Sequence, residues 1–319
     1  MAPTTNVKLD PIYAVYCKQA KLFPKASKGE ITIHQLRVLS DENSKKQELP
    51  DVIEEDKVIL YKGTELRMTL FRPPGTENDI LPVVIYFHGG GSVCGSKYTH
   101  GKPVRDICLK NNVAVVFSDY LLAPEAQFPK AHQDCYLTIS WVAENASTIM
   151  VDHEKIAVCG DSAGAGFCAC AMVKAKENGL GNAIKTQILL YPITARTREN
   201  FESSHLFGGE DYNLTAEDAI FYTKTYYGED PTTDKFGFPL LATVDELKDL
   251  PRTLIVTAEA DVLRDEAEAY YRKLIEAGVS ASSIRILGAV HGFINIPFET
   301  SAYKQTMQLI SYQLKGAFH

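Results

Sequence analysis

The stretch Ile156-Ala157-Val158-Cys159-Gly160-Asp161-Ser162-Ala163-Gly164 decides how this sequence folds. Its first four residues are apolar and read as a short buried strand, and the small residues from Ala163 to Asn178 favour a helix that stops at Gly179. A serine between a strand and a helix, with a glycine two positions away on either side, sits on a tight turn that exposes its hydroxyl. The G-x-S-x-G pattern alone is short enough to occur by chance. Its strand-to-helix setting favours a catalytic Ser162.

The alternation of strands and helices continues on both sides of this stretch. Near-continuous apolar runs at Pro82–Phe87 and Val113–Ser118 are typical of strands buried on both faces. Further strands or helices are predicted at Ala131–Asn145, Thr186–Tyr191, Thr253–Ala258, Glu266–Glu276, Ile284–Leu287 and Thr300–Leu314. The order predicts an α/β fold with a mostly parallel central sheet, helices on both faces, and a ligand site at the carboxyl ends of the strands.

Two regions depart from the alternation. Residues 1–30 are predicted to be mostly helical, with Pro11 at a first helical position. The segments Ile31–Leu39, Val58–Tyr61 and Glu65–Phe71 are predicted strands because they are rich in β-branched or alternating apolar residues. Between Ile193 and Asp249 the alternation lapses around an amphipathic segment, Thr215–Tyr227. We interpret that region as an insertion that covers an edge of the sheet.

Composition excludes several classes of function. The chain has 319 residues, 45% of them hydrophobic and 23% charged, and a net charge of −7, which argues against disorder and against a nucleic-acid partner. Its apolar runs are too short to span a membrane. Seven cysteines without a C-x-x-C pair suggest neither a disulfide framework nor a metal site, and no cofactor is expected. The first residues lack the apolar segment of a secretory signal, so a cytoplasmic location is expected.

A second motif, His88-Gly89-Gly90-Gly91, follows a predicted buried strand. Three glycines let backbone N–H groups approach a ligand closely, as an oxyanion hole requires. We therefore predict oxyanion donors among Gly89, Gly90 and Gly91, together with Ala163. A phosphate-binding loop is the alternative, but no Gly-Lys-Ser/Thr follows. The imidazole of His88 is expected to order the loop by hydrogen bonding rather than to transfer a proton.

Two further polar residues follow predicted strands. Asp261 comes after Thr253–Ala258, and His291 comes after Ile284–Leu287. The chain order Ser162, Asp261, His291 is that of the nucleophile, acid and base in α/β-hydrolases. Nearby Asp265 and Glu259 are competitors for the role of the acid, although Asp265 starts a predicted helix, where capping explains it as well.

With these motifs in this order, the chain resembles a known family, the hormone-sensitive-lipase-like carboxylesterases of the α/β-hydrolase superfamily. The motifs that carry the resemblance are Tyr86–Gly91, Asp119–Glu125, Gly160–Gly164, Leu190–Pro192, Thr257–Glu266 and His291–Phe293. The resemblance implies a triad of Ser162, Asp261 and His291. It also implies one α/β-hydrolase domain over residues 1–319, in which a helical cap of about 1–50 and 194–245 covers a catalytic core of about 51–193 and 246–319. Members of the family are monomers or homodimers.

The resemblance is imperfect near the expected substrate pocket. The family usually has large aromatic residues after the third glycine, where this chain has Ser92 and Cys94. We expect a different, roomier acyl site, with Ser92, Cys94, Asp161 and Phe293 as candidate pocket residues.

The motifs together predict a serine esterase that hydrolyses small to medium acyl esters through an acyl-enzyme. An enzyme of the same family that cleaves amides or carbamates would use the same residues and stays an alternative. A non-catalytic small-molecule receptor is the other alternative. Receptors of this family lack the catalytic histidine, whereas His291 is present here.

Overall fold

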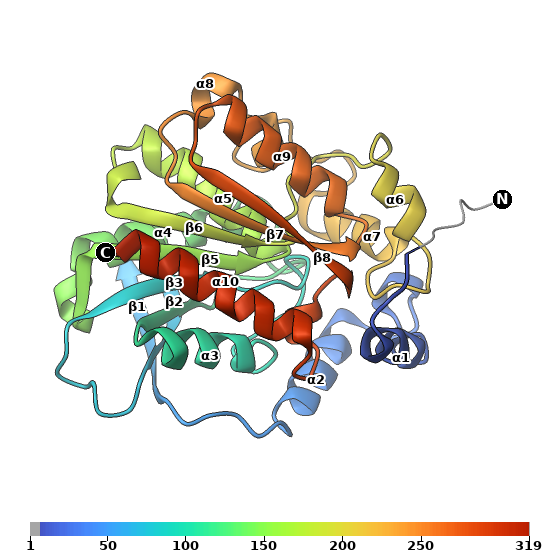
Figure 1. The fold of residues 1–319 in the computed structure, drawn as a ribbon, viewed down its shortest axis with the longest axis horizontal. Helices are drawn as coiled ribbons and strands as arrows, with labels where there is room; N and C mark the ends of the chain where they lie inside the picture. The colour runs from blue at the N-terminus through green and yellow to red at the C-terminus, as the bar shows by residue number, and fades with distance from the viewer. Residues whose placement is uncertain (1–6, 319) are drawn as a thin grey trace.

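A computed structural model describes residues 7–318 of the chain, which form one eight-stranded sheet covered by helices on both faces (Figure 1). The strand order is β1-β2-β4-β3-β5-β6-β7-β8. Strand β2 pairs antiparallel with β1 and with β4, and all other neighbours are parallel. The strands are β1 Ile53–Tyr61, β2 Thr64–Arg72, β3 Leu81–Phe87, β4 Ala114–Ser118, β5 Val151–Asp161, β6 Ile184–Leu190, β7 Arg252–Ala260 and β8 Ala281–Val290. The predicted α/β-hydrolase fold with a mostly parallel sheet is confirmed.

Helices divide between the two faces of the sheet, and each face has its own apolar core. One core includes residues of α4 (Lys130–Asn145), α5 (Ala163–Glu177) and α9 (Arg264–Glu276). The other includes residues of α3 (Gly101–Asn111) and α10 (Ser301–Phe318). The central strands are buried on both sides, which explains why their sequences are apolar without alternation.

The prediction of a strand at Ile31–Leu39 is wrong. After α1 (Pro11–Ala20) and a short 3-10 helix (Ala26–Lys28), the chain forms helix α2 over Ile33–Ser44. The side chain of Thr32 accepts a hydrogen bond from the backbone N–H of Gln35, whose side chain accepts one from the N–H of Thr32. This capping box satisfies free N–H groups at the start of α2, and it outweighs the β-propensity of the neighbouring isoleucines.

Helices α1, α2, α6 (Glu202–Phe207) and α7 (Ala216–Tyr227) gather at the end of the sheet toward which β7 and β8 point (Figure 1). Ion pairs join the N-terminal segment to the insertion between β6 and β7. They are Lys21–Asp211, Lys25–Asp218 and Lys28–Glu210. A short helix, α8 (Val244–Leu247), leads back to β7. The division of the chain into a catalytic core and a cap stays a prediction. Residues 1–6 of the predicted cap and residue 319 of the predicted core lie outside the described residues.

No helix within residues 7–318 is both long enough and apolar enough to cross a membrane.

Candidate active site

Ser162 occupies a strained turn between β5 and α5. Its φ of +53° and ψ of −119° lie where a side-chain-bearing residue is rarely found. The turn is held because the N–H of Ser162 donates to the carbonyl of Leu190 at 2.8 Å. A Cβ at Gly164 would lie 2.0 Å from the carbonyl oxygen of Phe87, so only glycine permits this helix to start so close to β3. The G-x-S-x-G spacing thus follows from backbone crowding around the serine.

The structure brings Ser162, His291 and Asp261 into one hydrogen-bonded chain. His291 Nε2 lies 2.9 Å from Ser162 Oγ, and His291 Nδ1 lies 2.8 Å from Asp261 Oδ2. A carboxylate at Nδ1 favours the tautomer that carries its proton there, which leaves the Nε2 lone pair facing the serine hydroxyl. The other oxygen of Asp261 accepts a hydrogen bond from the N–H of Leu263 at 2.8 Å. All three residues are buried.

The two other candidate acids are engaged elsewhere. Asp265 accepts hydrogen bonds from the N–H of Ser203 and from Arg264. Glu259 accepts a hydrogen bond from the N–H of Gly288. Neither of these carboxylates is hydrogen-bonded to His291, so Asp261 is the acid that the geometry favours.

The glycine loop lies beside Ser162 in an unusual backbone conformation. Gly90 and Gly91 have φ of +113° and +63°. A Cβ at Gly91 would lie 2.5 Å from the ring of Tyr222. The N–H of Gly89 is already used, because it donates to Asp161 Oδ1 at 2.9 Å. The N–H groups of Gly90, Gly91 and Ala163 have no such side-chain acceptor among residues 7–318 and stay the candidate oxyanion donors.

His88 orders this loop from inside the protein. It is fully buried, its ring stacks on Tyr120 with centroids 4.2 Å apart, and its Nδ1 lies 2.7 Å from the carbonyl of Gly89. Burial, with the neighbouring His100 adding to it, lowers the pKa of His88 to about 3. A neutral imidazole enclosed in this way is placed to hold the loop.

A cavity of about 370 Å³ opens over Ser162 and His291. It is lined by Cys94 and Asp161, two of the predicted pocket residues, and by side chains from the N-terminal segment and from the insertion. Those side chains include Tyr16, Leu36, Arg198, Asn213 and Tyr222. Ser92 lines a smaller, adjoining hollow with Gly91, Ala163 and Tyr222.

Phe293 is a correction to the predicted pocket. It is fully buried and packs edge-on against the rings of Tyr13 and Tyr191, with centroids 6.3 and 5.5 Å away. Because the chain turns through Gly292 at a φ of +73°, the side chain of Phe293 points into the core and not into the substrate cavity.

Sequence reasoning missed the residues that the insertion and the loop after His291 bring to the site. Asn213 donates a hydrogen bond to the carbonyl of His291 at 2.9 Å. Tyr222 packs over Gly91, and Asn295 donates to Asp161 at 3.0 Å. No local pattern marks these residues, since the insertion and the loop after His291 are brought to the site only by the fold.

A serine on a strand-to-helix turn, a histidine and an aspartate at later strand ends, and a glycine loop beside them define a hydrolase of the α/β type. A family model described as "alpha/beta hydrolase fold" matches residues 84–295. An arylesterase of Saccharolobus solfataricus is 32% identical over 269 residues, which cover 82% of this chain and 83% of the relative. A carboxylesterase of Mycobacterium tuberculosis is 32% identical over 85% of both chains.

A solved structure agrees with these relatives. In work on two fungal esterases from Rhizomucor miehei, one structure matches this chain with a TM-score of 0.94 at 46% identity, covering 98% of this chain and 99% of that one. The chain belongs to the hormone-sensitive-lipase-like carboxylesterase family of the α/β-hydrolases, as its motifs predicted.

Proposed function

We propose that this carboxylic ester hydrolase works through a covalent acyl-enzyme on Ser162, with His291 as general base and Asp261 as the group that orients it. The observation that carries the proposal is the unbroken chain of contacts, 2.8 Å from Asp261 to His291 and 2.9 Å from His291 to Ser162. In this arrangement Ser162, a weak nucleophile, has His291 as its base, and Asp261 fixes the tautomer of His291. Nucleophilic catalysis by serine needs both contacts.

Acylation begins when Ser162 Oγ attacks the ester carbonyl carbon and gives its proton to His291 Nε2. The imidazolium that forms is stabilised by the Asp261 carboxylate. The C–O bond to the alcohol then breaks, and His291 returns the proton to the departing alkoxide. Water attacks the acyl-enzyme in the same way, with His291 again as base, and releases the carboxylic acid together with free Ser162.

A negative charge develops on the carbonyl oxygen as each tetrahedral intermediate forms. We assign the stabilisation of this charge to the N–H groups of Gly90, Gly91 and Ala163. Each such donor is typically worth about 3 kcal/mol of barrier. Gly89, also predicted as a donor, has its N–H directed to Asp161 and is assigned a supporting position.

The cavity favours small to medium acyl esters. A volume of about 370 Å³ is at the small end of ligand pockets. We propose that residues up to about 50 and residues 194–245 act as the cap of this site, because side chains of both segments line the cavity. A cytoplasmic location and a monomeric or homodimeric state stay predictions.

The test is hydrolysis of p-nitrophenyl esters from acetate to palmitate, with p-nitroacetanilide as the amide. We expect turnover of the short and medium esters, little turnover of palmitate, and a loss of at least about 10³-fold in Ser162→Ala. Preferred cleavage of the anilide would support the amide-cleaving alternative. Ester binding without turnover in the wild type would support the receptor alternative.

A further inference from the structure

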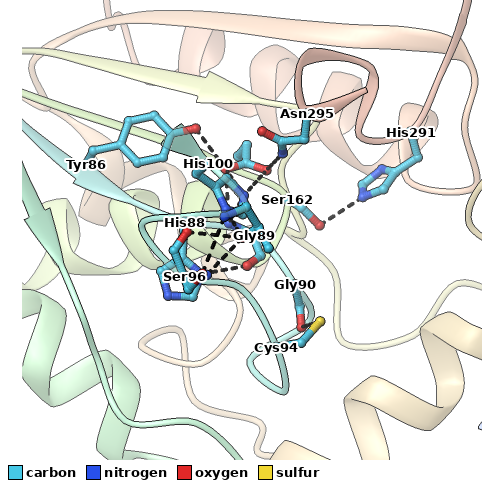
Figure 2. Close-up of polar contacts among 12 residues, drawn as sticks. Tyr86, His88, Gly89, Gly90, Cys94, Ser96, His100, Ser162, His291 and Asn295 are labelled. Carbon is cyan, nitrogen blue, oxygen red and sulfur yellow. Dashed lines mark hydrogen bonds and ion pairs between the residues drawn. The ribbon is translucent and has the colours of Figure 1, made fainter. Parts of the chain in front are cut away.

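A buried carboxylate beside the nucleophile has no part in the proposed reaction. Asp161 is 2% exposed. Its Oδ1 accepts hydrogen bonds from the hydroxyl of Tyr86 and the N–H of Gly89, both at 2.9 Å, and its Oδ2 accepts one from the Asn295 amide at 3.0 Å. His100 Nε2 lies 3.3 Å from Oδ1. Figure 2 shows Tyr86, Gly89, His100 and Asn295 close together beside Ser162. Four groups, two of them from the end of β3 and the loop after it, thus converge on one carboxylate.

The surroundings keep this carboxylate charged. Burial alone would raise the pKa of Asp161, yet attraction and hydrogen bonding from His100, and the hydrogen bond from Tyr86, hold it below its usual value. Hydrogen bonds to an ionised acceptor are shorter and stronger than neutral ones. The contacts of Asp161 are therefore stiff links between the segments they join.

Those segments are the three loops of the site. Asp161 precedes Ser162 in the nucleophile turn, and Gly89 precedes the candidate oxyanion donors Gly90 and Gly91. Asn295 ends the 3-10 helix Phe293–Asn295, which begins two residues after His291. A Cβ at Gly89 would lie 2.5 Å from Asp161 Oδ2, so the oxyanion loop rests directly on the carboxylate.

The environment of Asn295 singles out its amide donor. The Nδ2 atom of Asn295 donates to Asp161, whereas its Oδ1 atom is buried and has no hydrogen-bond partner within residues 7–318. Leaving a buried acceptor unpaired destabilises a protein, by about 1–3 kcal/mol in typical cases. An apolar side chain would avoid that loss, so packing alone does not account for an asparagine here.

We propose that Asp161 and Asn295 form a positioning pair, in which the Asp161 carboxylate sets the oxyanion loop and the His291 loop at fixed distances from Ser162. Both residues line the cavity over Ser162, but neither supplies a reacting atom, and the pair acts through Gly89 and through the helix after His291. The inference rests on the proposed function, because positioning matters only if Ser162 is the nucleophile.

The first test removes the donor in Asn295→Ala. Small displacements of oxyanion donors and base act on the transition state, so we expect kcat on p-nitrophenyl acetate to fall about 10-fold or more, with KM within about twofold. The affinity for a trifluoromethyl ketone, which mimics the tetrahedral intermediate, should fall in parallel. The matched control is Asn145→Ala, which removes an amide hydrogen bond to the carbonyl of Trp141 far from the site and should leave kcat unchanged.

The second test exchanges the pair. Asp161→Asn sets one amide donor against another, and we expect a loss of kcat at least as large as that of Asn295→Ala. In the double variant Asp161→Asn/Asn295→Asp, the amide introduced at position 161 can still accept from Gly89 and Tyr86 through its oxygen. Its N–H can donate to the carboxylate introduced at position 295. We expect kcat to recover by about fivefold or more over Asp161→Asn, because donor and acceptor are again matched.

Rates are expressed per active site titrated with a fluorophosphonate, and unfolding midpoints are recorded for every variant. Normal kcat in Asn295→Ala, or a double variant no better than Asp161→Asn, would overturn the positioning pair. Failure of the proposed function looks different, since the wild type would then be inactive or Ser162→Ala would remain active.

Discussion

The loops at the strand ends and the helices that cover them are built by different kinds of interaction. In the loops, backbone conformation is dictated by contact. Ser162 is held at a positive φ, and Gly91 and Gly164 have no room for a Cβ. The N-terminal segment that carries α1 and α2 and the insertion that carries α6 and α7, together called the cover, are joined partly by ion pairs near the surface, such as Lys21–Asp211 and Lys28–Glu210.

The loops at the strand ends and the segments that cover them are expected to influence different kinetic constants. Exposed ion pairs contribute little stability, typically about 0–1 kcal/mol. The cover also leaves large apolar side chains in solvent, with Leu22 85% and Phe23 61% exposed. We therefore expect changes in the loops to act on kcat and changes in the cover to act mainly on KM.

The largest effect is expected from Ser162→Ala. Without the nucleophile no acyl-enzyme can form, and kcat should fall by at least about 10³-fold, since the remaining oxyanion donors can only assist attack by water. Steady-state hydrolysis of p-nitrophenyl acetate measures the loss. A variant that keeps a tenth of the wild-type rate would exclude Ser162 as the nucleophile.

A large effect is also expected from Gly91→Ala. The added methyl would meet the Tyr222 ring at 2.5 Å and would oppose the φ of +63°, so the loop must shift and kcat should fall about 100-fold. Gly278→Ala is the matched control, because Gly278 also has a positive φ, +77°, but open space around it. The control should lose a little stability and no rate. Equal rates in the two variants would contradict the assigned oxyanion loop.

Acid should destabilise the loop region through His88. The pKa of His88 is about 3 in the folded protein and about 6.5 in an unfolded chain. Below pH 6.5 the unfolded state therefore binds more protons than the folded state, and the protein becomes less stable as the pH is lowered. At pH 5 this one residue accounts for about 2 kcal/mol of lost stability relative to neutral pH. Urea unfolding at pH 7 and pH 5 measures it.

His88→Gln isolates that contribution. The variant is expected to be less stable than the wild type at pH 7, since the stacking on Tyr120 is lost, but to show a smaller further loss at pH 5. An unchanged loss between the two pH values would mean that His88 is not the group responsible.

The smallest effect is expected in the cover. Lys25 pairs with Asp218, a residue that lines the cavity, and its removal loosens the contact between the N-terminal segment and α7. For Lys25→Met we expect KM to rise about threefold with kcat little changed. Lys62→Met, which breaks the exposed pair with Glu144 outside the cover, is the control. A fall in kcat without a change in KM would contradict the division between loops and cover.

The same division explains what could be predicted from the sequence. Buried strands and the turn at Ser162 leave local signals, because a run of apolar residues or a required glycine is visible in a few consecutive positions. Asp261 and His291 could be proposed from the sequence because each follows a strand, and parallel strands end at one edge of the sheet. The glycine loop could be proposed as the oxyanion loop for a similar reason, from its glycines.

The rest was missed for local reasons and for long-range ones. Ile31–Leu39 looked like a strand by its β-branched residues, which hid a local helix-start signal, the capping box of Thr32 and Gln35 at the start of α2. Phe293 was placed in the pocket by its nearness to His291 in sequence, whereas the turn at Gly292 directs it inward. Asp161 is hydrogen-bonded to a residue 134 positions away, Asn295, and no spacing pattern encodes such a contact.

The most direct test of the account is to trap the covalent intermediate. Wild-type protein is mixed with p-nitrophenyl acetate, quenched in acid within the first turnover, digested and mapped by mass spectrometry. We predict one acetyl group on the peptide that contains Ser162, formed with a burst of p-nitrophenol, and none in Ser162→Ala. Acetylation at another residue that persists in Ser162→Ala, or turnover without any acylated peptide, would contradict an acyl-enzyme on Ser162.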